Sequence, residues 1–119
     1  MELVKKGRPK VLDSITERIQ TGCGYLYVTI GFEEAGTHPI EIRAALGKAG
    51  GCSNCQLEAL NRAVSLGLQY GIPPQEFVRE LKGHKCPSPQ MWPEDAQVLS
   101  CPDGVAKALE RYISPEGEE

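Results

Sequence analysis

The sequence has few aromatic residues and no long hydrophobic run. Aromatic side chains make up 6% of the 119 residues, with one tryptophan, and there are only 2 histidines. No apolar stretch approaches the roughly 18 residues that a membrane-spanning helix needs. The basic first ten residues are not followed by the apolar stretch of a secretory signal. We therefore expect no membrane partner and a cytoplasmic location, where thiols stay reduced.

The sequence also lacks the short motifs that mark common active sites. It has no phosphate-binding loop, no nucleophile elbow and no H-E-x-x-H metal motif. Asp13, Asp95 and Asp103 belong to no recognisable acid–base constellation and are interpreted as solvated charges or helix caps. With 13 basic and 16 acidic residues, the formal net charge of −3 makes nucleic acid an unexpected partner.

The sequence does contain the pattern of polar and apolar residues that is typical of one small α+β domain. Polar and apolar residues alternate in three stretches: from Ser14 onward, over residues 25–32 and over residues 38–46. This alternation predicts three strands, paired as an antiparallel meander with one face buried. Helical periodicity then predicts a helix over about 53–70, with Ser53 and Gln56 as a capping box. A short helix opened by Pro73-Pro74 and a last helix over about 102–113 are also predicted. We expect about three helices packed on one face of the sheet.

The ends of the chain lie outside this pattern. Residues 1–13 are interpreted as a flexible arm or linker, residues 14–113 as the folded domain, and residues 114–119 as an acidic disordered tail. Within the domain, structural turns are expected at four positions. These are Gly24, Gly50, Gly51 and Pro102.

A proline-bearing loop from His84 to Val98 carries the only tryptophan. Met91 and Trp92 form a large apolar pair on this loop, and such pairs often mark a contact with a partner. The alternative is that Trp92 folds back over the core beside the cysteines.

Five cysteines are many for a chain of this size. An odd number in a reducing compartment argues against a disulfide framework. Each cysteine lies beside a backbone breaker or near a helix start, where a thiolate is stabilised, and none lies on an apolar stripe. This placement favours a tetrahedral zinc site over buried structural thiols, and zinc over an iron–sulfur cluster. The five are Cys23, Cys52, Cys55, Cys86 and Cys101.

The spacing alone leaves the metal ligands open. Cys52 and Cys55 form one C-x-x-C pair without a second, so the ligands would come from separate turns, with His38 and His84 as spare candidates. C-x-x-C at a helix start is also typical of a dithiol redox relay. The βαβ order of thioredoxin-like folds is missing, however.

A third alternative is a zinc module that binds nucleic acid. It would use the basic residues of the arm together with exposed aromatic side chains. The residues concerned are Lys5, Lys6, Arg8, Lys10, Tyr25, Tyr27 and Trp92.

Several stretches, in this order, resemble the TSCPD domain. They are TGCGYLYVTI (21–30), GKAGGC (47–52), EALNRAVSLGLQYGIPPQE (58–76), LKGHKCP (81–87) and LSCPDGVAKALE (99–110), preceded by RPKVL (8–12). The resemblance covers roughly residues 8–113. That domain is found at the C-terminal side of adenosylcobalamin-dependent (class II) ribonucleotide reductases and as short stand-alone proteins.

The resemblance implies a metal site and a partner. Cys23, Cys52, Cys86 and Cys101 match the family's cysteines, whereas Cys55 is an extra thiol or a substitute ligand. The family implies a non-catalytic zinc module or accessory subunit. It would act with the catalytic subunit of an adenosylcobalamin-dependent ribonucleoside-diphosphate reductase, in deoxyribonucleotide synthesis for DNA replication. Cobalamin would be bound only by that partner. We expect no reductase activity from the isolated chain, because the radical chemistry resides in a large barrel domain.

Overall fold

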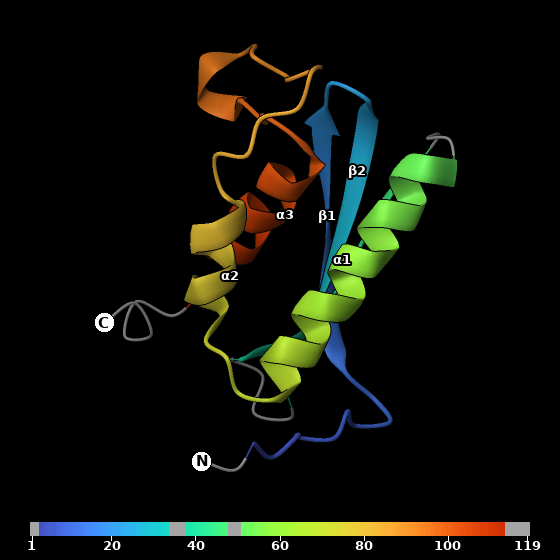
Figure 1. Cartoon of the computed structure of the whole chain (residues 1–119), viewed down its shortest axis with the longest axis vertical. Helices are drawn as coiled ribbons and strands as arrows, with labels where there is room; N and C mark the ends of the chain where they lie inside the picture. Colours follow the sequence, from blue (N-terminus) through green and yellow to red (C-terminus); the bar gives the residue numbers. More distant parts are fainter. Residues whose placement is uncertain (1–2, 34–37, 48–50, 114–119) are drawn as a thin grey trace.

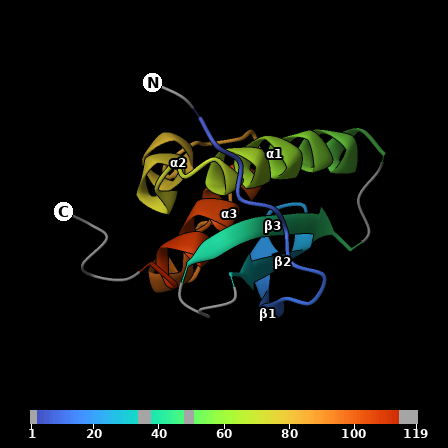
Figure 2. The same cartoon turned by 90° about the horizontal axis from the view of Figure 1, so that it is seen from below.

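The computed structural model describes residues 3–33, 38–47 and 51–113. Its elements are β1 (Asp13–Thr21), β2 (Gly24–Phe32), β3 (Pro39–Leu46), α1 (Gly51–Gln69), α2 (Pro74–Leu81), the short 3₁₀ helix η1 (Glu94–Ala96) and α3 (Cys101–Glu110). The strands form one antiparallel sheet in the order β1-β2-β3. The three α-helices pack against one face of this sheet, which confirms the expected α+β architecture (Figures 1 and 2). No helix among these residues is long and apolar enough to cross a membrane.

Alternation along β2 divides its side chains between a buried face and an open face. Leu26, Val28 and Ile30 are fully buried beneath the helices. Tyr25 and Tyr27 project from the opposite face and remain 46% and 42% exposed. One face of the sheet therefore carries the core, as the period of two predicts.

Helix α1 lies along β3, and α3 packs against α2 and the central part of the sheet (Figure 2). Leu57, Val64 and Leu68 form the buried stripe of α1. Gly104 brings α3 unusually close to the sheet, because a Cβ there would lie 2.9 Å from Leu26 Cδ2.

Helix α1 begins at Gly51, two residues before the predicted start. The expected capping box is therefore wrong, because Ser53 lies inside the helix. Asn54 explains the earlier start. Its side chain accepts a hydrogen bond from Leu46 N–H at 2.9 Å and donates one to Leu46 C=O at 3.2 Å. These two bonds hold the first turn of α1 against the end of β3.

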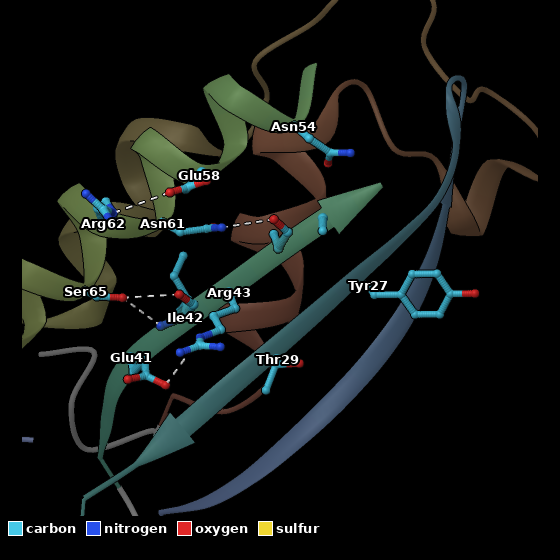
Figure 3. A pocket seen from close by; sticks show the side chains of 12 residues that line it. Tyr27, Thr29, Glu41, Ile42, Arg43, Asn54, Glu58, Asn61, Arg62 and Ser65 are labelled. Carbon is cyan, nitrogen blue, oxygen red and sulfur yellow. Dashed lines mark hydrogen bonds and ion pairs between the residues drawn. The ribbon is translucent and has the colours of Figure 1, made fainter. Parts of the chain in front are cut away.

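Side chains of α1 close the outer edge of β3, where a further strand could otherwise pair. Ser65 repeats the arrangement of Asn54: its hydroxyl accepts from Ile42 N–H at 2.9 Å and donates to Ile42 C=O at 3.2 Å. Two more amides donate to β3 carbonyls, Asn61 to Ala44 at 2.9 Å and Gln69 to Ile40 at 3.4 Å. Figure 3 shows Ser65 and Asn61 reaching across to the strand. The outward carbonyls of β3 are thus satisfied without another strand.

The loop between α2 and α3 is anchored as a small hairpin. Gln90 and Val98 exchange two backbone hydrogen bonds, of 2.8 and 2.9 Å. Trp92 points outward and is 71% exposed, and Met91 is 42% exposed. The alternative in which Trp92 folds back over the core is therefore wrong. The side chain has the access that a partner contact requires.

Residues 3–12 cross one end of the fold as an irregular segment. Lys6 N–H donates to Gln69 C=O at 2.7 Å, and the Lys6 ammonium pairs with Glu33 at 2.7 Å. Arg8 pairs with Glu41 at 2.5 Å. Strand β1 then begins at Asp13, the last residue of the expected arm. The expected acidic tail, residues 114–119, lies outside the described residues.

Candidate metal centre

Three of the five cysteines line one pocket at the end of the sheet. Cys23 comes from the β1–β2 turn, Cys86 from the loop after α2, and Cys101 is the first residue of α3. The pocket has a volume of about 510 Å³, and Ser53 and Gln56 of α1 form part of its wall. All five cysteines are free thiols. Segments that are far apart in the chain thus bring three sulfurs into one cavity.

The position of Cys23 depends on a tight turn and a glycine contact. A Cβ on Gly22 would lie 1.7 Å from the carbonyl oxygen of Ser88, so only glycine lets the turn meet the loop this closely. Thr21 is buried, and its hydroxyl accepts from Cys23 N–H at 3.1 Å and donates to Gly24 C=O at 2.7 Å. Gly24, with φ of 119°, is the first residue of β2, directly after the turn at residues 22–23.

The sulfur of Cys86 is oriented by its own loop. Cys86 N–H donates to Leu99 C=O at 2.9 Å, which ties the loop to the segment before α3. Ser88 N–H donates to Cys86 Sγ at 3.4 Å. Hydrogen bonds of this kind commonly orient metal ligands from outside the coordination sphere.

Cys101 is partly buried, like Cys86. Burial raises the pKa of the Cys101 thiol, and the neighbouring Cys23 and Cys86 add to the rise, while a hydrogen bond with Thr21 opposes it. A negative charge on one of these sulfurs would therefore disfavour a charge on the others. A bound cation would reverse this effect by stabilising all three thiolates.

Asp103 joins the segments around this site. It is fully buried, so of its two interpretations the solvated charge is wrong, whereas its place beside the N-cap of α3 agrees with the helix cap. Its carboxylate accepts from Gly83 N–H at 2.8 Å and Leu99 N–H at 2.9 Å, and pairs with the Lys107 ammonium at 3.0 Å. Burial by itself would raise the pKa of Asp103, but these hydrogen bonds and Lys107 outweigh it and the pKa is lowered.

The signal that could have revealed this role was the S-x-x-D pattern at 100–103. Ser100 is the N-cap of α3, and its hydroxyl oxygen accepts from Asp103 N–H at 3.1 Å. The Ser100 hydroxyl also donates to the His84 carbonyl at 2.5 Å. In an ordinary capping box the acidic side chain would return to the N-cap N–H. Here it reaches Leu99 and Gly83 instead, and so joins both ends of the loop to α3.

The two cysteines of α1 lie outside the pocket lining. Cys52 and Cys55 are both exposed in the first turns of the helix. Cys52 lies four residues before Gln56 and is therefore about 40° from that pocket-lining residue around the helix. Cys55 is about 100° from Gln56, on the outer side. By this geometry Cys52 is nearer than Cys55 to the pocket-lining side of the helix, and neither lines the pocket.

The remaining predicted site residues are placed as follows. Gly51 begins α1, Pro102 lies in the first turn of α3, and Gly50 is outside the described residues. Neither His38 nor His84 lines the pocket. Among the residues that the structure describes, no three His, Cys, Asp or Glu side chains are arranged to hold a metal ion as they stand.

The donor chemistry of the pocket fits a thiophilic metal. Three thiols line it, and no carboxylate or imidazole is among the lining side chains. Sulfur donors of this kind suit Zn²⁺ or an iron–sulfur cluster and do not suit Mg²⁺ or Ca²⁺.

Comparison with known proteins gives one match. The family model described as the TSCPD domain matches residues 2–113. No curated protein and no solved structure matches the chain. The matched range contains the β1–β2 turn, the loop after α2 and the start of α3, from which the three pocket thiols come. The chain belongs to the TSCPD domain family.

Proposed function

We propose that this chain is a non-catalytic zinc module that acts with an adenosylcobalamin-dependent ribonucleotide reductase. The observation that carries the metal part is the convergence of Cys23, Cys86 and Cys101 from three separate segments in one pocket. These are three of the four cysteines that match the family pattern. Free thiols that served only to fill the core would not be expected to meet at one cavity.

Cys52 is the fourth ligand in this proposal. It is one residue before the pocket-lining Ser53. Its sulfur would have to turn inward at the start of α1, and that of Cys55 would have to turn about 60° further around the helix. When bound, zinc would cross-link the hairpin, the loop and the two helix starts and neutralise the thiolates. The metal would then close the fold at this end of the sheet.

The partner follows from the family rather than from the pocket. The described residues form one small sheet with three helices, and radical nucleotide reduction needs separate nucleotide and cobalamin sites. The chain therefore acts as a module of, or an accessory to, a catalytic subunit in deoxyribonucleotide synthesis. Trp92 and Met91 are our candidates for the contact, because both are exposed on an anchored loop.

Metal analysis of the purified chain and of single Cys→Ser variants tests the zinc site. We expect about one zinc per chain, and loss of zinc on replacement of Cys23, Cys52, Cys86 or Cys101. Cys101→Ser should also lower the free energy of unfolding by several kcal/mol, because the binding energy of a structural zinc is folding energy.

Cys55→Ser is the matched control and should retain both zinc and stability. A folded wild-type chain that contains no metal would overturn the zinc site. Visible absorbance would identify an iron–sulfur cluster instead. If Cys55→Ser lost zinc and Cys52→Ser retained it, Cys55 and not Cys52 would be the fourth zinc ligand.

A second candidate is a dithiol relay, favoured by the exposure of both Cys52 and Cys55. A relay needs Cys52 as a free thiol, whereas the zinc site needs it as a ligand. Thiol alkylation of the zinc-loaded chain separates the two. Protection of Cys52 with rapid labelling of Cys55 supports zinc, and rapid labelling of both supports the relay.

A further inference from the structure

The open face of the sheet carries a pair of exposed aromatic rings on its central strand. We define the open face by the polar and aromatic side chains opposite the helices: Thr16, Arg18, Tyr25, Tyr27, Thr29 and Arg43. Tyr25 and Tyr27 are two residues apart on β2, so their Cα atoms are separated by about 6.8 Å. That is twice the rise of about 3.4 Å between stacked bases in one strand. Two successive, splayed bases could therefore each lie on one ring.

The sequence of β2 agrees with a known aromatic arrangement for base stacking. From Gly24 to Ile30 it reads G-Y-L-Y-V-T-I. RNA-recognition sheets carry K/R-G-F/Y-G/A-F-V-x-F/Y, and their exposed aromatic residues stack on bases. Tyr25 and Tyr27 take the two exposed aromatic positions. Leu26, Val28 and Ile30 take the inward positions and are fully buried.

The basic first position of that pattern is Cys23 here, and neighbouring strands supply the positive charge instead. The Arg18 guanidinium on β1 lies 4.4 Å from the centroid of the Tyr25 ring. Arg43 on β3 pairs in register with Thr29. Its side chain is 74% exposed, and its guanidinium lies 3.9 Å from the Glu41 carboxylate. Glu41 also pairs with Arg8 at 2.5 Å. Three arginines, Arg8, Arg18 and Arg43, therefore stand around this one carboxylate and the two rings.

The net charge of the whole chain conceals this distribution. Three glutamates of the tail, Glu116, Glu118 and Glu119, account for the entire formal charge of −3. Residues 1–113 are formally neutral, and the cations Arg18 and Arg43 stand on the open face. The net charge of the whole chain therefore does not oppose nucleic-acid binding at this surface.

We propose that the open face of the sheet binds single-stranded nucleic acid. Successive bases stack on Tyr25 and Tyr27, and the phosphates lie near Arg18 and Arg43.

A groove of about 640 Å³ extends this surface beyond Tyr27, between β3 and α1. Figure 3 shows Tyr27 and Thr29 on β2, Arg43 on the adjacent strand, and Asn54 and Arg62 on the α1 side of this groove. Glu41 and Glu58 also line this groove, and Arg62 pairs with Glu58 at 3.6 Å. The groove therefore offers hydrogen-bonding groups for the edge of a further base, while its carboxylates disfavour a phosphate there. Neither tyrosine lines the thiol pocket, and this proposal does not require bound zinc.

Fluorescence anisotropy with labelled 12-nucleotide oligo(dT) and oligo(U) tests this proposal on the full chain at low salt. Tyr25→Leu and Tyr27→Leu keep an apolar side chain but remove the stacking ring. Each should weaken binding by about 5- to 150-fold, the effect of losing one base–aromatic stack. Tyr27→Phe should bind as the wild type does. Arg43→Gln should reduce the slope of log affinity against log salt by about 0.7.

Tyr70→Leu is the matched control, because Tyr70 is also partly exposed, at 36%, but follows the end of α1. Circular dichroism verifies that each variant is folded. Absence of wild-type binding up to about 100 μM, the weak end of non-specific affinities, would overturn the proposal. So would equal binding by the wild type and both leucine variants. Binding that depends only on Lys5 and Lys6, tested with the double glutamine variant, would assign the affinity to the arm and also refute the proposal.

Discussion

Asp103 is the residue on which the geometry of the C-terminal half depends. Its side chain has no exposed surface, and it binds Gly83 and Leu99, the two ends of the loop that carries Cys86. Its own helix carries Cys101 at the first position. One carboxylate therefore sets the distance between the segments that supply two of the pocket thiols.

Asp103→Asn should destabilise the fold by about 3 kcal/mol or more. An asparagine has one acceptor oxygen, so one backbone N–H would face an amide N–H, and Lys107 would lose its charged partner. Urea unfolding measures the change. Asp95→Asn is the control, because Asp95 is exposed on η1, and its effect should stay within about 0.5 kcal/mol. Equal stability of the two variants would contradict the role assigned to Asp103.

Gly22 is the second residue with a specific structural requirement. An alanine methyl group would overlap the Ser88 carbonyl, so Gly22→Ala must push the hairpin away from the loop. We expect the variant to lose zinc to a chelator faster than the wild type, because Cys23 moves away from Cys86. Gly51→Ala is the control, since a Cβ there meets nothing within 4 Å. Unchanged zinc retention in Gly22→Ala would count against Cys23 as a ligand.

At the scale of elements, α1 acts both as a core helix and as the cover for a strand edge. Its apolar stripe packs on the sheet, and its polar side chains occupy the outer hydrogen-bonding groups of β3. Because an uncovered edge can recruit other chains, this arrangement should protect against aggregation as well as add stability.

Ser65→Ala tests the edge cover. It removes two hydrogen bonds to Ile42 and leaves a partly buried N–H without its partner, which should cost about 1–3 kcal/mol. Thermal unfolding and light scattering measure stability and aggregation. Arg62→Ala is the control on the same helix, because Arg62 forms only an exposed pair with Glu58 at 3.6 Å. A stable, non-aggregating Ser65→Ala variant would show that the edge cover is unimportant.

At the scale of the whole molecule, the fold offers three candidate surfaces for the proposed functions. The thiol pocket lies at one end of the sheet, Trp92 projects from the loop before α3, and the tyrosine pair occupies the open face. Arg18 of the open face and Trp92 line one pocket, so these two surfaces adjoin each other.

The partner proposal is tested by a pull-down with a cobalamin-dependent reductase subunit. We expect the wild type to associate at micromolar concentration and Trp92→Ala to associate more weakly, since an exposed tryptophan at an interface often carries much of the binding energy. Leu66→Ala is the control. Leu66 is also an exposed apolar residue, but it lies on α1, so this variant should bind like the wild type. No association of the wild type would remove the support for an accessory role. Turnover of a ribonucleotide by the chain alone would show that it is an enzyme.

Local patterns in the sequence were sufficient for the class of fold and most element positions. Burial repeats every two residues on a strand and every 3.6 residues on a helix. The spacing of Leu26, Val28 and Ile30 therefore identifies a strand, and that of Leu57, Val64 and Leu68 identifies a helix, without any long-range information. The positions of Gly71 and Gly83 after α1 and α2 follow from the same local rules, since both adopt positive φ.

Tertiary structure decided the features that depend on residues distant in sequence. Four features result from contacts between segments that no local periodicity describes. They are the meeting of Cys23, Cys86 and Cys101, the burial of Asp103, the exposure of Trp92 and the start of α1 at Gly51. A polar side chain is stable in the interior only where distant groups satisfy its hydrogen bonds. The sequence contains those groups, but only the packed fold shows that they are within reach.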